Sequence, residues 1–204
     1  MDKLLLGTSN PGKLLELRQL LKGLEYRVLD PGEVKLKRPL QIAETGATFE
    51  ENAIIKARGY AAASGLLTLA DDSGLEIESL GGEPGVYSAR YGGEELSYPQ
   101  RFELILERLL GCQGEQRRAR FRCVMALATP QGNCTSWEAS LDGLIALQPR
   151  GEGGFGYDPI FYVPELGATL AEVRPGLKNL YSHRGRAALK ARQVLELRMA
   201  GARA

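Results

Sequence analysis

The chain opens with a short apolar run, a glycine-containing loop and an amphipathic stretch, and this order constrains the fold most. The three leucines at positions 4–6 predict a buried strand. After Leu14, leucines recur every three or four residues among charged ones, which predicts an amphipathic helix. The loop between them, residues 7–14 (GTSNPGKL), matches the phosphate-binding pattern G-x-x-x-x-G-K-[S/T] except at Leu14. The chain is therefore expected to begin with a β-loop-α unit.

This loop has the chemistry of an anion site. Backbone N–H groups in the first turn of a helix, with the positive end of the helix dipole, attract phosphate. Lys13 adds a full positive charge, and Thr8, Ser9 and Asn10 add short polar side chains. An ordinary βα turn with a solvated lysine is the alternative. Because Leu14 has no hydroxyl group to hold Mg²⁺, a metal ion would need acidic residues elsewhere in the chain.

Length and composition bound the class of protein. The 204 residues suit one domain, and 44% hydrophobic with 25% charged residues is typical of a soluble globular fold. The net charge of +1 argues against a nucleic-acid-binding face. No apolar run approaches the roughly 18 residues of a membrane helix, and the first residues do not resemble a signal peptide. The cysteines show no C-x-x-C spacing, so we expect reduced thiols in a cytoplasmic protein.

Helical and extended segments alternate along the rest of the chain. Their expected ranges are 48–65, 66–70, 97–111, 119–129, 134–141 and 177–204. The first, third and last are helices, and capping boxes at Thr48 and Ser97 begin two of them. The others are strands, of which the last two form a hairpin. This mixture favours an α/β fold with a mixed sheet.

Two adjacent carboxylates, Asp71 and Asp72, follow the expected strand 66–70. In α/β sheets, ligands bind beyond the carboxyl ends of strands. Successive residues of an extended segment point in opposite directions, so we expect the two side chains to do different jobs and one of them to face a site. A solvated turn is the alternative, because Asp-Asp-Ser-Gly is also favourable turn chemistry.

A magnesium ion takes oxygen ligands and usually only one or two protein carboxylates, together with substrate phosphates. The candidate ligands are Glu44, Glu51, Asp71 and Asp72. Lys56, on the expected helix 48–65, would either offer a cation to a phosphate or be a solvated surface lysine.

A glycine-rich segment and a basic pair supply groups that suit a flat heterocycle. In residues 153–159 (GGFGYDP), Phe155 could stack on a base and Asp158 could accept hydrogen bonds from ring N–H groups. A tight loop anchored by its aromatic residues is the alternative. His183, the only histidine, precedes Arg184, and the pair could donate to a carbonyl oxygen or a phosphate. Together with the loop and the acids, these groups indicate a nucleotide site with a metal.

Six motifs, in this order, resemble the inosine/xanthosine triphosphate pyrophosphatase family, the house-cleaning dITP/XTP hydrolases. They are residues 8–13 (TSNPGK), 44–53 (ETG and FEENA), 70–74 (ADDSG), 84–91 (PGVYSARY), 155–159 (FGYDP) and 182–185 (SHRG). The resemblance covers roughly residues 3–195. In many members of the family the residue before Glu44 is also acidic, but here it is Ala43.

The resemblance implies one domain, residues 1–204, with an elongated mixed β-sheet flanked by helices and two lobes around a central substrate cleft. It implies a Mg²⁺-dependent homodimeric enzyme that hydrolyses ITP, dITP and XTP to the monophosphate and pyrophosphate. Asp72 would be the general base and a metal ligand, with Glu44 as a second ligand. Together with Lys56, the substrate-binding residues would be Thr8, Ser9, Asn10, Pro11, Gly12, Lys13, Ser73, Phe155, Gly156, Tyr157, Asp158, Lys178, His183 and Arg184.

Other functions fit parts of this pattern. A septum-inhibitor-like nucleotide pyrophosphatase would act on other modified nucleotides, although Gly12-Lys13 and His183-Arg184 argue against it. A nucleotide-binding module without turnover would bind the same ligands and release nothing. An RNA-binding domain has poor support from the near-neutral charge.

Overall fold

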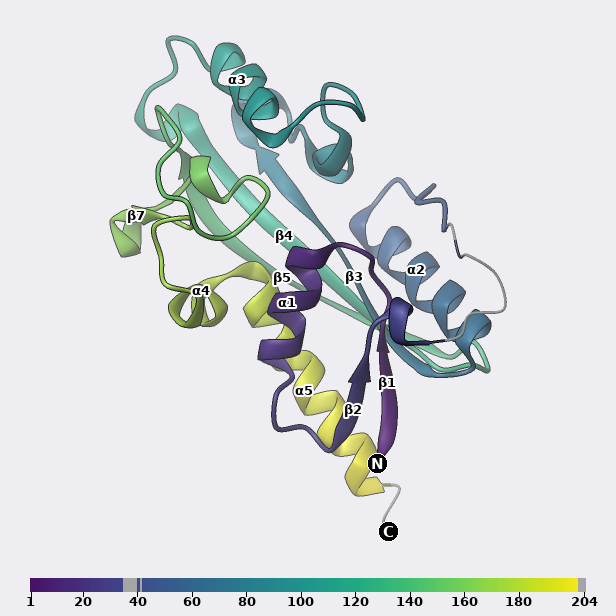
Figure 1. The fold of residues 1–204 in the computed structure, drawn as a ribbon. Coiled ribbons are helices and arrows are strands. Elements are labelled where there is room, and N and C mark those ends of the chain that lie inside the picture. The colour runs from purple at the N-terminus through teal and green to yellow at the C-terminus, as the bar shows by residue number, and fades with distance from the viewer. Residues whose placement is uncertain (35–39, 41, 202–204) are drawn as a thin grey trace. The chain divides into compact units, whose positions relative to one another are not determined.

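The protein was analysed as a computed structural model that describes residues 1–34, 40 and 42–201. Within these ranges, seven strands form one mixed sheet in the order β2-β1-β3-β4-β5-β6-β7 (Figure 1). β1 pairs in parallel with β2 and β3, whereas β6 pairs antiparallel with both β5 and β7. The strands are β1 (Asp2–Leu6), β2 (Tyr26–Leu29), β3 (Leu67–Ile77), β4 (Arg118–Ala128), β5 (Cys134–Ile145), β6 (Phe161–Val163) and β7 (Ala168–Thr169). The predicted α/β class with a mixed sheet is confirmed.

The described helices are capped much as the sequence predicts. They are α1 (Pro11–Leu20), α2 (Phe49–Ser64), α3 (Tyr98–Arg108), α4 (Pro175–Tyr181) and α5 (His183–Gly201). Short 3₁₀ helices are η1 (Pro31–Glu33), η2 (Glu78–Leu80), η3 (Gly85–Arg90), η4 (Gly114–Arg117), η5 (Asp158–Ile160) and η6 (Pro164–Leu166). Thr48 and Glu51 form the predicted capping box of α2, which ends at Gly65 with φ of 69°. No helix in the described ranges is both long and apolar enough to cross a membrane.

The chain divides into two compact units. Unit 1 comprises Met1–Asp72, Cys123–Ala139 and Arg184–Ala204, and unit 2 comprises Ser73–Arg122 and Ser140–His183. β3, β4 and β5 each change unit within their length, so each of these strands contributes residues to both.

Unit 1 has its own core, in which helices cover both faces of its strands. Leu69 of β3 packs in a cluster with side chains of α1 and α5. Thr68 and Ala70 of β3 lie close to Tyr60 of α2. All three surround Gly7, because a side-chain carbon at Gly7 would be 3.0 Å from the Tyr60 ring and 3.1 Å from both Thr68 and Ala70. Because side chains alternate along a strand, α2 covers the face of β3 opposite to α1 and α5.

Unit 2 has a separate core on one face of its strands. α3 contributes Phe102 and Ile105, which pack with Phe121 of β4 and Phe161 of β6. The rings of Phe121 and Phe161 lie 4.4 Å apart.

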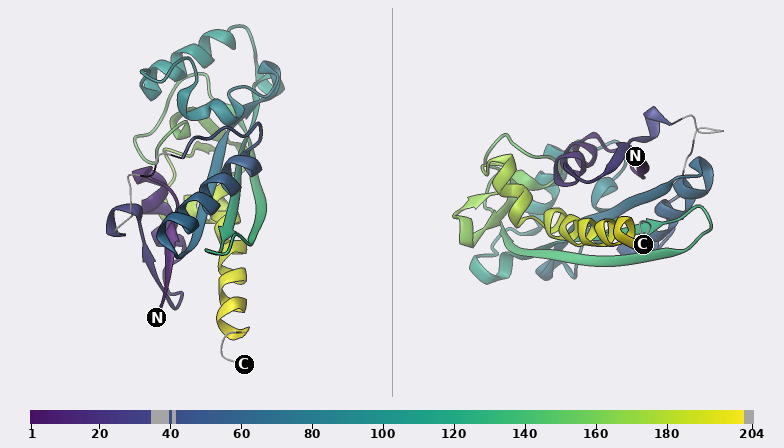
Figure 2. Two further views of the ribbon diagram at one scale, coloured as in Figure 1. Left: turned by 90° about the vertical axis from the view of Figure 1, so that its right-hand side faces the viewer. Right: turned by 90° about the horizontal axis from the view of Figure 1, so that it is seen from below.

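Two of the predicted elements differ most from the structure. The strand predicted at 66–70 continues to Ile77, so Asp71 and Asp72 lie inside β3 and not beyond its end. The helix predicted from 177 to the end is interrupted at Ser182, which has ψ of 154° and separates α4 from α5. α5 then runs as one continuous helix, drawn in yellow in Figure 2.

Candidate active site

The loop after β1 has the predicted strand-to-helix geometry. The N–H group of Gly7 donates to the carbonyl oxygen of Leu69 on β3, at 2.8 Å. Asn10 is the N-cap of α1, and its Oδ1 accepts a hydrogen bond from the N–H group of Lys13 at 3.1 Å. The hydroxyl oxygen of Thr8 accepts one from the N–H group of Asn10 at 3.2 Å. These bonds fix the first turn of α1 and orient its N-terminus.

Asp71 lies at the centre of a buried ion-pair network on the α1 and α5 side of β3. Its Oδ2 lies 3.0 Å from Nζ of Lys13 and 3.3 Å from Nη2 of Arg184. Nη1 of Arg184 lies 2.8 Å from Oε2 of Glu16 on α1. Oδ1 of Asp71 is buried and accepts no hydrogen bond within the part of the chain that the structure describes.

This network keeps Asp71 ionised. Burial opposes its charge, but Lys13, Arg184 and Lys56 outweigh burial and hold the pKa of Asp71 well below its usual range. Asp71 is therefore a permanent counter-ion for the cations around it.

Asp72 faces α2, on the opposite side of β3. Its Oδ1 lies 2.7 Å from Nζ of Lys56, and the same Nζ lies 3.2 Å from Oε1 of Glu44. Asn52, one turn before Lys56, donates from Nδ2 to Oδ2 of Asp72 at 3.4 Å. Oδ1 of Asn52 accepts the N–H group of Gly46 at 2.8 Å, which ties the segment that carries Glu44 to α2. The prediction that the two aspartates point in opposite directions is confirmed.

The charges of Asp72, Lys56 and Glu44 affect one another. Burial raises the pKa of Asp72, and the ammonium group of Lys56 opposes that rise. Burial also opposes the charge of Lys56, but Asp72, Asp71 and Glu44 outweigh it and raise the pKa of Lys56. Lys56 is only 7% exposed, which excludes the alternative that it is a solvated surface lysine.

The donor set suits a hard divalent cation. Within residues 1–34, 40 and 42–201, no three His, Cys, Asp or Glu side chains are grouped closely enough to hold a metal by themselves. Mg²⁺ usually needs only one or two protein carboxylates, completed by water and substrate phosphates. Asp72 and Glu44 already share one cation, the ammonium group of Lys56, so two carboxylates converge on one point. The residues present therefore fit a magnesium ion.

Sequence reasoning missed two residues of these networks and the partners of a third. Glu16 and Asn52 were not predicted as site residues, and Asp71 was considered only as a metal ligand. Asn52 precedes Lys56 by one helical turn, so their shared face was a usable signal. Nothing in the spacing of Glu16 indicated that Arg184 would be its partner.

Apart from Arg184, the predicted base-binding residues lie in unit 2, where Phe155, Asp158 and Lys178 form one group. Oδ2 of Asp158 accepts the N–H group of Phe155 at 2.8 Å and lies 2.5 Å from Nζ of Lys178. The same Nζ lies 4.9 Å from the centre of the Phe155 ring. The ring of His183 stacks on that of Phe121, with centroids 4.6 Å apart and planes 15° apart.

Other predicted residues have simpler surroundings. Tyr157 is buried and donates its hydroxyl group to the carbonyl oxygen of Ser88 at 2.8 Å, so it anchors its loop in unit 2. Gly156 has φ of 63°, which favours glycine. Ser73 is half-buried on β3. Although His183 and Arg184 are adjacent, Arg184 belongs to the Asp71 network of unit 1, and their predicted joint contact with a ligand stays a prediction.

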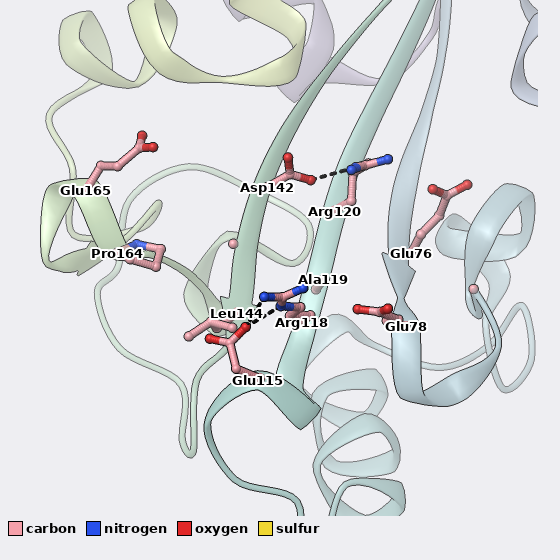
Figure 3. Close-up of a pocket in the computed structure, with 12 residues that line it drawn as sticks. Glu76, Glu78, Glu115, Arg118, Ala119, Arg120, Asp142, Leu144, Pro164 and Glu165 are labelled. Carbon is pink, nitrogen blue, oxygen red and sulfur yellow. Dashed lines mark hydrogen bonds and ion pairs between the residues drawn. The ribbon is translucent and has the colours of Figure 1, made fainter.

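A pocket of about 750 Å³ in unit 2 contains none of the predicted site residues (Figure 3). It lies along an exposed face of β4 and β5, where Arg120 pairs with Asp142 at 2.6 Å and Arg118 pairs with Glu115. Ion pairs between exposed side chains such as these are typical of a solvated sheet face. The predicted site residues lie instead in the networks around Asp71 and Asp72 and in the group around Asp158.

Comparison with known proteins shows which family the chain belongs to. Residues 4–194 match the Ham1 family. The chain belongs to the Ham1 family. The resemblance inferred from the sequence is thereby confirmed.

Several Ham1 relatives cover almost the whole chain. A dITP/XTP pyrophosphatase of Thermus thermophilus is 52% identical over 185 residues, which are 91% of this chain and 87% of the relative. The dITP/XTP pyrophosphatase of Bacillus subtilis is 45% identical over 196 residues, 96% of this chain and 98% of the relative. A solved HAM1 protein from Coxiella burnetii matches with a TM-score of 0.86 at 43% identity, covering 96% of this chain and 99% of that one.

Proposed function

We propose that this Ham1 protein is a nucleoside-triphosphate pyrophosphatase that hydrolyses ITP, dITP and XTP to the monophosphate and pyrophosphate. It would thereby remove deaminated purines from the nucleotide pool. The names of its curated relatives support this activity. The observation on this chain that carries the proposal is a pair of buried lysine–aspartate contacts on opposite faces of β3, Lys13 of α1 with Asp71 and Lys56 of α2 with Asp72.

The charge balance of the two networks supports a metal-dependent reaction. Three cationic side chains meet four carboxylates in unit 1: Lys13, Lys56 and Arg184 against Glu16, Glu44, Asp71 and Asp72. The protein alone therefore leaves an excess of negative charge and does not neutralise a triphosphate. When bound by Asp72 and Glu44, Mg²⁺ would supply the missing positive charge and polarise a phosphoryl oxygen.

The side chains have distinct tasks in this mechanism. Residues 8–13 and the first turn of α1 would bind the triphosphate, with Lys13 stabilising the negative charge that develops. Asp72 would take a proton from water as the water oxygen attacks phosphorus. The bond from that phosphorus to the pyrophosphate then breaks, and pyrophosphate leaves. Lys56 would add a second cation for the phosphates.

Base selection belongs to the group in unit 2. Hypoxanthine and xanthine present an acceptor at position 6, where adenine presents a donor. A pocket lined by Phe155, Gly156, Tyr157 and Asp158, with donors from Lys178 or His183, would favour the oxo bases. Arg184 would assist, although its guanidinium group also holds Glu16 and Asp71. We further infer a cytoplasmic homodimer that binds neither nucleic acid nor membrane.

A substrate panel tests the activity. Pyrophosphate release would be measured for ITP, dITP, XTP, ATP, GTP and pyrimidine triphosphates, with Mg²⁺ and with a chelator. We expect kcat/KM for ITP, dITP and XTP to exceed that for ATP by about 10²-fold or more, because unmatched polar groups reject the wrong base. Chelation should abolish release. Equal turnover of ATP and ITP would contradict the proposal, binding without release would indicate a non-catalytic module, and preference for other modified nucleotides would indicate a septum-inhibitor-like enzyme.

The role of Asp72 has its own test. Asp72→Asn keeps the size of the side chain and removes the base, so we expect kcat to fall by about 10²-fold or more. Asp142→Asn is the matched control, since Asp142 is exposed and pairs only with Arg120 among the described contacts. Near-full activity in Asp72→Asn would refute the general-base assignment.

A further inference from the structure

Lys56 occupies an unusual position for a residue expected to bind phosphate. Its ammonium group lies between two carboxylates, 2.7 Å from Oδ1 of Asp72 and 3.2 Å from Oε1 of Glu44. These are the two residues that the proposed function assigns to the metal. The side chains of Lys56 and Asp72 are only 9% and 7% exposed, so water does little to screen their contact, whereas the Glu44 side chain is 34% exposed.

The two carboxylates are held in place from other directions as well. Asn52 donates to the second oxygen of Asp72 and accepts the N–H group of Gly46, two residues after Glu44. A side-chain carbon at Gly46 would lie 2.6 Å from Cβ of Glu51 and 2.8 Å from Oδ1 of Asn52, so the close approach of this segment to α2 requires glycine. The side chain of Asp72 and the backbone beside Glu44 are therefore both tied to Asn52, and the cation between the two carboxylates is the ammonium group of Lys56.

We propose that Lys56 takes the place of the metal ion between Asp72 and Glu44 in the metal-free enzyme and is displaced when the metal binds. One ammonium group and one divalent cation compete for the same carboxylate oxygens. The displaced lysine is then available to a substrate phosphate, so metal binding precedes the phosphate contact of Lys56. Lys56 is thus a positioning residue for the metal site as well as a phosphate ligand. This inference rests on the proposed function in one respect, that Asp72 and Glu44 are the metal ligands.

The competition has a measurable consequence without substrate. In wild-type protein, the free energy of Mg²⁺ binding includes the unfavourable step of moving the Lys56 ammonium group away from the two carboxylates. In Lys56→Met this step is absent. We expect the Kd of Lys56→Met for Mg²⁺, measured by calorimetry without nucleotide, to be at least about tenfold lower than that of wild type, a usual size for such coupling. Lys22→Met is the matched control, because Lys22 is exposed in the turn that follows α1, and the Kd of this variant should equal that of wild type. A Kd for Lys56→Met equal to or higher than that of wild type would overturn the inference.

A second measurement uses the unmodified protein, in case Lys56→Met fails to fold without metal. In lysine-labelled wild type, the ¹⁵Nζ resonance of Lys56 should shift during a Mg²⁺ titration and saturate together with metal binding, while that of Lys22 stays fixed. No shift at saturating Mg²⁺ would contradict displacement. If the protein hydrolyses dITP with Mg²⁺ but shows neither the lower Kd in Lys56→Met nor the shift of the Lys56 resonance, the displacement of Lys56 is wrong and the proposed function stands. Protein that binds no Mg²⁺ and releases no pyrophosphate would overturn the proposed function with it.

Discussion

At the scale of single residues, two adjacent aspartates acquire opposite electrostatic characters. Lys13 and Arg184 outweigh burial at Asp71 and lower its pKa, whereas burial raises the pKa of Asp72. Neighbouring carboxyl groups whose pKa values are pushed apart are typical of a division between a fixed counter-ion and a proton acceptor. This supports Asp72, and not Asp71, as the general base.

Asp71 should contribute to stability in a pH-dependent way. Asp71→Asn leaves buried cations short of a counter-ion, so we expect a loss of about 3 kcal/mol in the free energy of unfolding at pH 7. The folded-state pKa of Asp71 is lowered, so its stabilisation is complete above the unfolded-state pKa of about 3.9 and is lost as pH falls through the folded-state pKa. Urea unfolding should therefore show a constant difference from wild type between pH 7 and about pH 5, and a smaller one below about pH 4.

The control for this experiment is again Asp142→Asn, whose exposed side chain should change stability little at any of these pH values. A difference between Asp71→Asn and wild type that stays the same or grows below about pH 4 would contradict the lowered pKa.

At the scale of elements, local signals predicted the helix starts better than the ends of strands. The capping boxes at Thr48 and Ser97 depend only on residues within one turn, and both are present. The strand at 66–70 was ended too early because Asp-Asp-Ser-Gly resembles a turn. In the fold, lysines from α1 and α2 neutralise both aspartates, so β3 continues through them, and no local pattern encodes those distant partners.

The break at Ser182 was predictable in principle. Serine is a preferred N-cap residue, and the extended ψ of Ser182 is typical of that position. Reading residues 177–204 by helical periodicity alone concealed it. The candidate site shows the same limit: Lys13, Asp72 and Lys56 were predicted from motifs, whereas Glu16 entered only through its tertiary contact with Arg184.

The capping box of α2 should matter because this helix carries Asn52 and Lys56. The hydroxyl oxygen of Thr48 accepts the N–H group of Glu51 at 3.1 Å, and Oε2 of Glu51 accepts that of Thr48 at 3.2 Å. We expect Thr48→Ala to lower the free energy of unfolding by about 1 kcal/mol, measured by urea denaturation with circular dichroism. Thr48→Ser keeps the acceptor and should retain most of the stability. An alanine variant as stable as wild type would show that the cap contributes nothing.

At the scale of the whole molecule, two compact units with separate cores agree with the two lobes that the family resemblance implies. The central substrate cleft and the single domain of residues 1–204 stay predictions. Covalent continuity favours the single domain, because β3, β4 and β5 each belong partly to unit 1 and partly to unit 2. Unfolding one unit would leave half of each of these strands without its packing.

This continuity predicts one cooperative unfolding transition. Trp137, the only tryptophan, reports on unit 1, where its Nε1 donates to the carbonyl oxygen of Ala187 at 2.9 Å. The double variant Trp137→Phe/Phe102→Trp moves the fluorophore to the core of unit 2, and Trp137→Phe alone is the control for the lost indole group. For each tryptophan-containing protein, the urea midpoint from fluorescence should coincide with the midpoint from far-ultraviolet circular dichroism of the same protein, since both probes would follow one all-or-none transition. If fluorescence from unit 2 changed at a clearly different urea concentration from the dichroism, the units would unfold separately and the chain would comprise two domains that share strands.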